Sequence, residues 1–154
     1  MEDLIHMFKY RNKPQLAKPL SQIMIDFINN YNLHLKGFDM LVAVPLHPSK
    51  LREREYNQAQ LLAQNISRNL SIPLLEGNLE RLKPTGPQSN LPAQKRWENV
   101  ANAFRLKHPL DFKDKRVLLI DDLLTTGATC SEVARTLNAA GVNSVYVLTL
   151  AIAQ

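Results

Sequence analysis

Hydrophobic residues recur along the chain with two different spacings, and segments of the two kinds alternate. Residues 14–32 carry apolar side chains three or four positions apart, as on the buried face of a helix. These side chains are Leu16, Leu20, Ile23, Met24, Phe27 and Tyr31. A second stripe with helical spacing runs through residues 58–70. Residues 40–44, 117–120 and 144–152 are instead almost continuously apolar, which predicts strands that are buried on both faces.

This alternation predicts an α/β protein with a mostly parallel central sheet flanked by helices on both faces. Residues 72–75 add an extended segment, and Gly141 marks the end of the helix before the last strand. We expect residues 1–154 to form a single domain. Ligands of such sheets bind at the carboxyl ends of strands, where this chain has Pro45 and Asp121.

Composition narrows the class of protein. No apolar run approaches the roughly 20 residues of a membrane span, and the N-terminus lacks an apolar leader, so we expect a cytoplasmic protein. The single cysteine, Cys130, excludes an internal disulfide and any multi-cysteine metal site, so we expect no zinc in this chain. The net charge of +5 favours anionic partners, either a phosphate-rich ligand or nucleic acid. The basic residues are scattered, however, which favours a solvated surface for most of them.

The segment 117–129, VLLIDDLLTTGAT, is the most informative part of the chain. Asp121 and Asp122 stand where an apolar strand is expected to end, and a loop of small residues follows and leads into a helix. The amides of a tight loop and the positive end of a helix dipole together bind phosphate, and Gly127 allows close approach. Carboxylates do not bind phosphate themselves, so the acid pair suits the vicinal hydroxyls of a sugar, or Mg²⁺. A solvated strand end followed by an ordinary turn is the alternative.

The segment resembles the 5-phosphoribosyl-1-pyrophosphate (PRPP) signature of type I phosphoribosyltransferases. The resemblance implies their Rossmann-like fold, with Asp121 and Asp122 on the ribose 2′- and 3′-hydroxyls. It also implies Mg²⁺ as a cofactor that arrives with PRPP and lies near this acid pair without direct protein ligands. The 5′-phosphate is then expected on Thr125, Thr126, Gly127, Ala128 and Thr129.

The segment 45–58, PLHPSKLREREYNQ, is a second candidate for anion binding. We expect a loop whose cations, Lys50, Arg52 and Arg54, neutralise pyrophosphate. A surface loop of mixed charge is the alternative, because two glutamates offset this charge. The segment resembles the Pro-Leu-His and Arg-x-Arg-Gly-Phe-Asn-Gln motifs of the ComF/GntX branch of phosphoribosyltransferases. The resemblance implies a pyrophosphate site formed by Pro45, Leu46, His47, Lys50, Arg52 and Arg54.

Two residues of this segment need separate interpretation. His47 is a candidate general base, but its position between prolines favours a loop residue. Glu55 stands where the branch usually has glycine, so it adds a negative charge beside the expected pyrophosphate and removes backbone freedom.

Residues 79–104 are polar, contain several prolines and are expected to be irregular. Within them, residues 81–100 resemble the same branch. We expect a lid that closes over pyrophosphate and excludes water, with Arg81, Lys83 and Arg96 as catalytic cations on it. A plain connecting loop is the alternative, although long loops in compact domains are usually functional or disordered. Trp97 is interpreted as an anchor for a helix at the end of this segment.

Together the motifs imply a phosphoribosyltransferase that moves the 5-phosphoribosyl group of PRPP to a nucleophile and releases pyrophosphate, with a role in natural transformation and DNA uptake. No residue identifies the acceptor. ComF-like proteins commonly carry a four-cysteine zinc module before the stretch that corresponds to Lys9-Tyr10, and this chain shows none. Either the chain is a short member or the module lies outside it.

A rival function from another class stays open. The protein can be a non-catalytic PRPP sensor that binds single-stranded DNA, which its positive charge permits. Aromatic side chains on which bases could stack are few; Tyr10, Tyr56 and Trp97 are the candidates beside cations. A homodimer is a further alternative on which the sequence does not decide.

Overall fold

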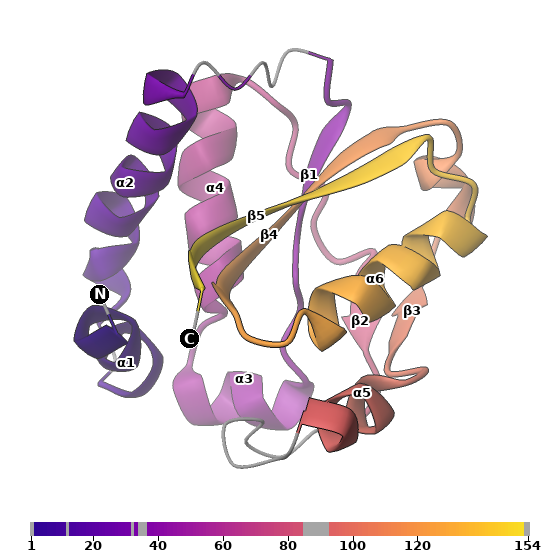
Figure 1. Ribbon diagram of the computed structural model, residues 1–154, viewed down its shortest axis with the longest axis horizontal. Helices are drawn as coiled ribbons and strands as arrows, with labels where there is room; N and C mark the ends of the chain where they lie inside the picture. Colours follow the sequence, from indigo (N-terminus) through magenta and orange to yellow (C-terminus); the bar gives the residue numbers. More distant parts are fainter. Residues whose placement is uncertain (1, 12, 32, 34–36, 85–92, 153–154) are drawn as a thin grey trace.

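A parallel sheet of three strands, in the order β1-β4-β5, lies at the centre of the described part of the protein (Figure 1). Its strands are β1 (Met40–Ala43), β4 (Arg116–Leu124) and β5 (Ser144–Ile152). The computed structural model describes residues 2–11, 13–31, 33, 37–84 and 93–152. Both strand pairs are parallel, so the predicted parallel α/β sheet is confirmed.

The predicted extended segment at 72–75 lies beside β1, on the side away from β4. The amide of Leu41 donates to the carbonyl of Pro73 at 2.7 Å, and the amide of Leu75 donates to the carbonyl of Leu41 at 2.9 Å. These two bonds form an isolated parallel bridge at Leu74. The sheet is thereby extended by one short segment. Its pairing is limited because Pro73 has no amide hydrogen to donate.

Helices cover both faces of the sheet, as the sequence predicted. On one face lie α2 (Ala17–Asn30), which follows a short 3₁₀ turn at Pro14–Leu16, and α4 (Gln58–Leu70) (Figure 1). On the other face lies α6 (Ala128–Ala139). Of the described helices, none combines the length and hydropathy that a bilayer crossing requires.

The centre of β4 fills both halves of the core. Leu118 and Ile120 pack into the cluster formed with α2 and α4, whereas Val117 and Leu119 pack into the cluster formed with α6. Successive side chains of a strand point to opposite faces, so an uninterrupted apolar run is what a doubly covered strand requires.

Three short helices lie near the carboxyl ends of β1 and β4: α1 (Glu2–Tyr10), α3 (Pro48–Arg54) and α5 (Ala93–Val100). They line the lower end of the sheet in Figure 1. A helix at the end of the 81–100 segment was expected and is confirmed by α5. The sequence analysis predicted neither α1 nor α3. The prediction of a loop at 45–58 is wrong for the residues that form α3.

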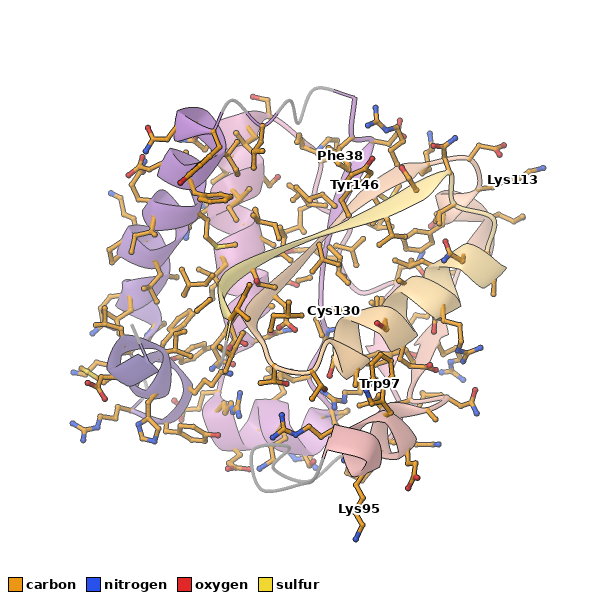
Figure 2. All side chains as sticks on the ribbon, in the orientation of Figure 1. Phe38, Lys95, Trp97, Lys113, Cys130 and Tyr146 are labelled. Atoms are coloured by element: carbon orange, nitrogen blue, oxygen red, sulfur yellow. The ribbon has the colours of Figure 1, made fainter. Side chains whose placement is uncertain are left out.

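Two expectations about strands need correction. Residues 79–104 were expected to be irregular, but β2 (Leu79–Arg81) pairs antiparallel with β3 (Phe104–Leu106). The strand at 144–152 has the predicted bounds but is not buried. As the edge strand it is half-buried, with 54% of Tyr146 and 43% of Val147 exposed. Tyr146 packs edge-on against Phe38 at the opposite end of the sheet from the candidate site (Figure 2).

Candidate functional site

The acid pair lies within β4, although the sequence predicted that the strand would end before it. Because neighbouring side chains of a strand point to opposite faces, Asp121 belongs to the α6 face and Asp122 to the face of α1, α2 and α4. Their contacts agree. Asp121 Oδ2 accepts from Cys130 Sγ at 3.6 Å, whereas Asp122 Oδ1 forms an ion pair with Lys9 Nζ at 3.1 Å. The two carboxyls therefore approach the sheet end from its two faces.

Asp121 has an unusual electrostatic environment. Burial raises the pKa of Asp121 to about 7, and the charge of Asp122 acts in the same direction. The Asp122 amide, which donates to Asp121 Oδ1 at 2.9 Å, and the Lys9 ammonium lower this pKa and only partly offset the rise. Burial and the Asp121 charge also raise the pKa of the Cys130 thiol, so this thiol stays protonated and donates. Figure 2 shows Cys130 in the first turns of α6, next to the sheet.

The loop after β4 presents unused amides. Gly127 precedes α6 with φ of +78°, a left-handed conformation that favours glycine, and no side chain caps this helix. Within the described part of the chain, the amides of Thr125, Thr126 and Gly127 donate to no protein acceptor. Ala128 N has only a long contact of 3.5 Å to Thr126 Oγ1, and Thr129 lies in the first turn of α6. The loop thus offers the donors that the predicted phosphate site requires.

His47 has a structural role at the start of α3. Its Nδ1 accepts from the amide of Ser49 at 3.2 Å and contacts Ser49 Oγ at 2.7 Å, so it is the helix N-cap. These contacts favour the loop interpretation over a general base. Pro45 and Leu46, both half-buried, connect β1 to this cap. They also line a cavity of about 270 Å³ on the side of β1 where residues 75–79 lie.

The three cations predicted to bind pyrophosphate lie on α3 in different settings. Lys50 Nζ pairs with Glu53 at 2.6 Å. Arg52 is exposed, and its side chain points roughly 200° around the helix from those of Lys50 and Arg54. Arg54 turns inward and donates to Tyr10 Oη at 3.3 Å. Its buried Nε has no hydrogen-bond partner among the described residues. Helical geometry thus groups Lys50 with Arg54 and separates Arg52 from them.

The cations of the predicted lid also lie in different surroundings. Arg81, the last residue of β2, lies over the Phe104 ring at 5.4 Å. Burial lowers the pKa of Arg81, the charge of Asp121 raises it and that of Arg54 lowers it, so these three groups share one electrostatic environment. Lys83 donates instead to the carbonyl of Ala101 at 2.6 Å.

The remainder of the predicted lid is described only in part. Arg96 is half-buried on α5, and residues 85–92 lie outside the described residues. Trp97 is 47% exposed and lies on α5 beside the first turns of α6 (Figure 2). This partly covered position is consistent with the predicted role of Trp97 as an anchor for α5.

The sequence analysis missed the contribution of α1. Lys9 reaches Asp122, and Tyr10 reaches Arg54, so both contact predicted site residues. The available signal was the pair Ile5 and Phe8, which are apolar, three positions apart and buried in the structure. This spacing is typical of a helix that packs on a core and places the next two residues at its edge.

The described residues contain no group of three or more His, Cys, Asp or Glu side chains that could hold a metal ion. Mg²⁺ usually binds to one or two carboxylates while substrate phosphates and water supply the other ligands. Two acids beside a loop that can bind phosphate are compatible with that arrangement.

Comparison with known proteins identifies relatives along nearly the whole chain. Residues 56–153 match the phosphoribosyl transferase domain family. Competence protein F of Haemophilus influenzae is 36% identical over 151 residues, which cover 96% of this chain and 66% of that protein. DNA utilization protein YhgH of Escherichia coli is 32% identical over 153 residues, which cover 96% of this chain and 65% of that protein. The chain spans about two thirds of the length of these curated relatives.

Solved structures show the same fold. Glutamine PRPP amidotransferase from B. subtilis superimposes with a TM-score of 0.54 at 20% identity, over 87% of this chain and 26% of that one. Adenine phosphoribosyltransferase from Leishmania donovani gives a TM-score of 0.51 at 18% identity, over 84% of this chain and 51% of that one. The predicted fold and the resemblance of the motifs are both confirmed. The chain belongs to the phosphoribosyltransferase family, as a ComF-like member with the type I fold.

Proposed function

We propose that the protein binds PRPP together with Mg²⁺ and transfers the 5-phosphoribosyl group to a nucleophile, with release of pyrophosphate. One observation carries the proposal: acids, unused amides and half-buried cations meet at the carboxyl ends of β1 and β4. Asp121 and Asp122 hold the ribose hydroxyls, and the loop 125–129 holds the 5′-phosphate. Lys50 and Arg54 bind the pyrophosphate, and Arg81 supports them from β2. We place this activity in the cytoplasm.

The donors of this region match the charge of the ligand. Arg54 Nε and the amides of Thr125, Thr126 and Gly127 lack protein acceptors among the described residues. A buried donor without a partner, such as Arg54 Nε, is costly, and a bound phosphate would satisfy it together with the amides of the half-buried loop. When bound with PRPP, Mg²⁺ neutralises pyrophosphate charge and so stabilises pyrophosphate as a leaving group.

The residues of this chain suit a dissociative displacement at the ribose C1 carbon. Such a reaction passes through a state like an oxocarbenium ion, as glycoside cleavage does, and needs no covalent nucleophile on the protein. Asp121 and Asp122 hold the sugar and place negative charge near the developing positive charge. Arg54 and Arg81 stabilise the charge that builds up on the departing pyrophosphate. No described residue identifies the acceptor.

Calorimetry with PRPP and Mg²⁺ tests the binding site. The wild-type protein should bind PRPP with a dissociation constant on the order of micromolar. Asp121→Asn combined with Asp122→Asn should abolish binding, because neutral amides lose the charge-assisted hydrogen bonds to the sugar. Asp26→Asn, an exposed change on α2, is the matched control and should bind normally. Equal affinity of the double variant and the wild type would reject the assignment.

A second assay tests the chemistry. Purified protein with PRPP and Mg²⁺ should release pyrophosphate when the correct acceptor is supplied, so a panel of nucleobases and amines is the appropriate screen. The double Asp121→Asn and Asp122→Asn variant is the blank. PRPP binding with no pyrophosphate release from any acceptor would favour the non-catalytic PRPP sensor.

A role in natural transformation, with single-stranded DNA as a partner, is the second candidate function. It is supported by relatives that are named competence and DNA utilization proteins, and by the net charge of +5. Affinity for an oligonucleotide that decreases as the salt concentration rises would support this role.

A further inference from the structure

The last turn of α1 contacts the acid half of the proposed site. Lys9 Nζ lies 3.1 Å from Asp122 Oδ1, and the two side chains are only 16% and 10% exposed. An ion pair as sheltered as this one is screened less than a surface pair. It also leaves a poorly solvated charge whenever one partner is removed.

The same turn contacts the basic half of the site. Tyr10 Oη accepts from Arg54 Nη2 at 3.3 Å, and the Arg54 guanidinium lies 5.0 Å from the centre of the Tyr10 ring. The carbonyl of Phe8 accepts from Tyr56 Oη at 2.5 Å and from Gln58 Nε2 at 3.2 Å. Since Phe8 is fully buried, α1 is firmly attached where α3 meets α4.

We propose that Lys9 is a positioning residue of the PRPP site: it holds Asp122 while the adjacent Tyr10 holds Arg54. One helical turn then sets the separation between an acid that binds the sugar and a cation that binds pyrophosphate. This inference rests on the proposed function. It adds α1, to which the sequence motifs assigned no role, as a wall of the site.

Hydrogen-bond capacity explains why Asp122 is the acid that needs such support. Both oxygens of Asp121 already accept from the protein, one from the Asp122 amide and the other from the Cys130 thiol. Asp122 is held through Oδ1 alone, and its Oδ2 has no partner among the described residues. Asp122 therefore has more capacity for the sugar hydroxyls, and its orientation depends on Lys9.

A double-mutant cycle without ligand tests the contact itself. Lys9→Met should lower Tm by about 5 °C, because it leaves a buried carboxylate without its cation. Adding Asp122→Asn should recover part of that loss, since the unpaired charge is then gone. Lys18→Met, on the exposed face of α2, is the control and should leave Tm unchanged. Additive Tm changes would show that Lys9 does not hold Asp122, and would overturn the proposal.

Calorimetry with PRPP and Mg²⁺ tests the positioning role. Lys9→Met should weaken binding about tenfold or more, and Lys9→Arg should restore most of the affinity because it keeps a cation at this position. In the Asp122→Asn background, Lys9→Met should cause little further loss. If the wild type binds PRPP but Lys9→Met binds equally well, or Lys9→Arg does not restore affinity, the positioning role is wrong. If the wild type does not bind PRPP, the proposed function itself fails, and this inference fails with it.

Discussion

Burial of the Asp121 carboxyl lowers the stability of the folded state when this carboxyl is charged. Its pKa is raised to about 7, above the value near 3.8 that an exposed aspartate has. The folded state therefore prefers the protonated carboxyl more than the unfolded state does. The contribution of this group to stability is greatest below about pH 4, decreases as pH rises toward 7 and stays constant above that.

Replacing Asp121 by asparagine should remove this pH dependence. A shift of this size corresponds to roughly 4 kcal/mol, and the partial exposure of the side chain reduces the expected effect to about 2 kcal/mol. Asp121→Asn should therefore be more stable than the wild type at pH 8, and the difference should vanish near pH 4. Thermal unfolding of both proteins at several pH values measures this difference in stability. Parallel Tm curves would contradict the assigned environment of Asp121.

Residue types alone placed the acid pair and the glycine loop next to each other, but did not predict the pairing of Lys9 with Asp122. A strand followed by carboxylates and a glycine loop is a local pattern, so it can be read along the sequence. The ion pair of Lys9 depends on how α1 packs against α4 and β4. Such long-range packing leaves no local spacing to detect.

At the scale of elements, α3 shows why the loop prediction failed. The segment PSKLRER has a proline and a histidine cap at its start but only one large apolar residue, Leu51. Hydrophobic periodicity therefore indicates nothing there, and capping alone is a weak signal. The predicted bounds of α4 and β5 are confirmed because their apolar patterns run the full length of each element. Burial of β5 was wrong because an apolar sequence does not distinguish an edge strand from a central one.

The end of α3 gives a physical reason for the glycine that the ComF/GntX motif usually has. Glu55 follows the helix with φ of +66°, in the left-handed region that costs a non-glycine residue roughly 1–2 kcal/mol. Glu55→Gly should raise stability by about 1 kcal/mol, or roughly 3 °C in Tm. It should also tighten PRPP binding, because a negative charge beside Lys50 and Arg54 is removed.

Glu55→Ala separates these two effects. Alanine removes the charge but keeps the strained backbone, so its PRPP affinity should approach that of Glu55→Gly while its Tm stays lower. If both variants have the same Tm, strain at this position does not limit stability. If neither binds PRPP more tightly than the wild type, the charge of Glu55 does not reach the site.

At the scale of the whole molecule, the net charge of +5 overstates the cations available for DNA. Ion pairs occupy Lys9, Lys50, Arg105, Lys107 and Arg135. Arg54 and Arg81 face the proposed PRPP site rather than open surface. The exposed cations outside these pairs lie on separate elements, such as Lys18 on α2, Arg68 on α4 and Lys95 on α5, so a strand of DNA meets only a few of them at once.

Binding of single-stranded DNA should accordingly be weak and only moderately dependent on salt. Contacts with about three phosphates give a slope of roughly −2 in a plot of log affinity against log salt concentration. Fluorescence anisotropy with a labelled oligothymidine between 50 and 200 mM salt measures this slope. Saturating PRPP and Mg²⁺ should reduce the affinity if DNA shares the cations of α3, and leave it unchanged if DNA binds elsewhere. A steep slope, as for many phosphate contacts, would contradict this charge distribution, because cations on separate elements would then have to contact one strand at once.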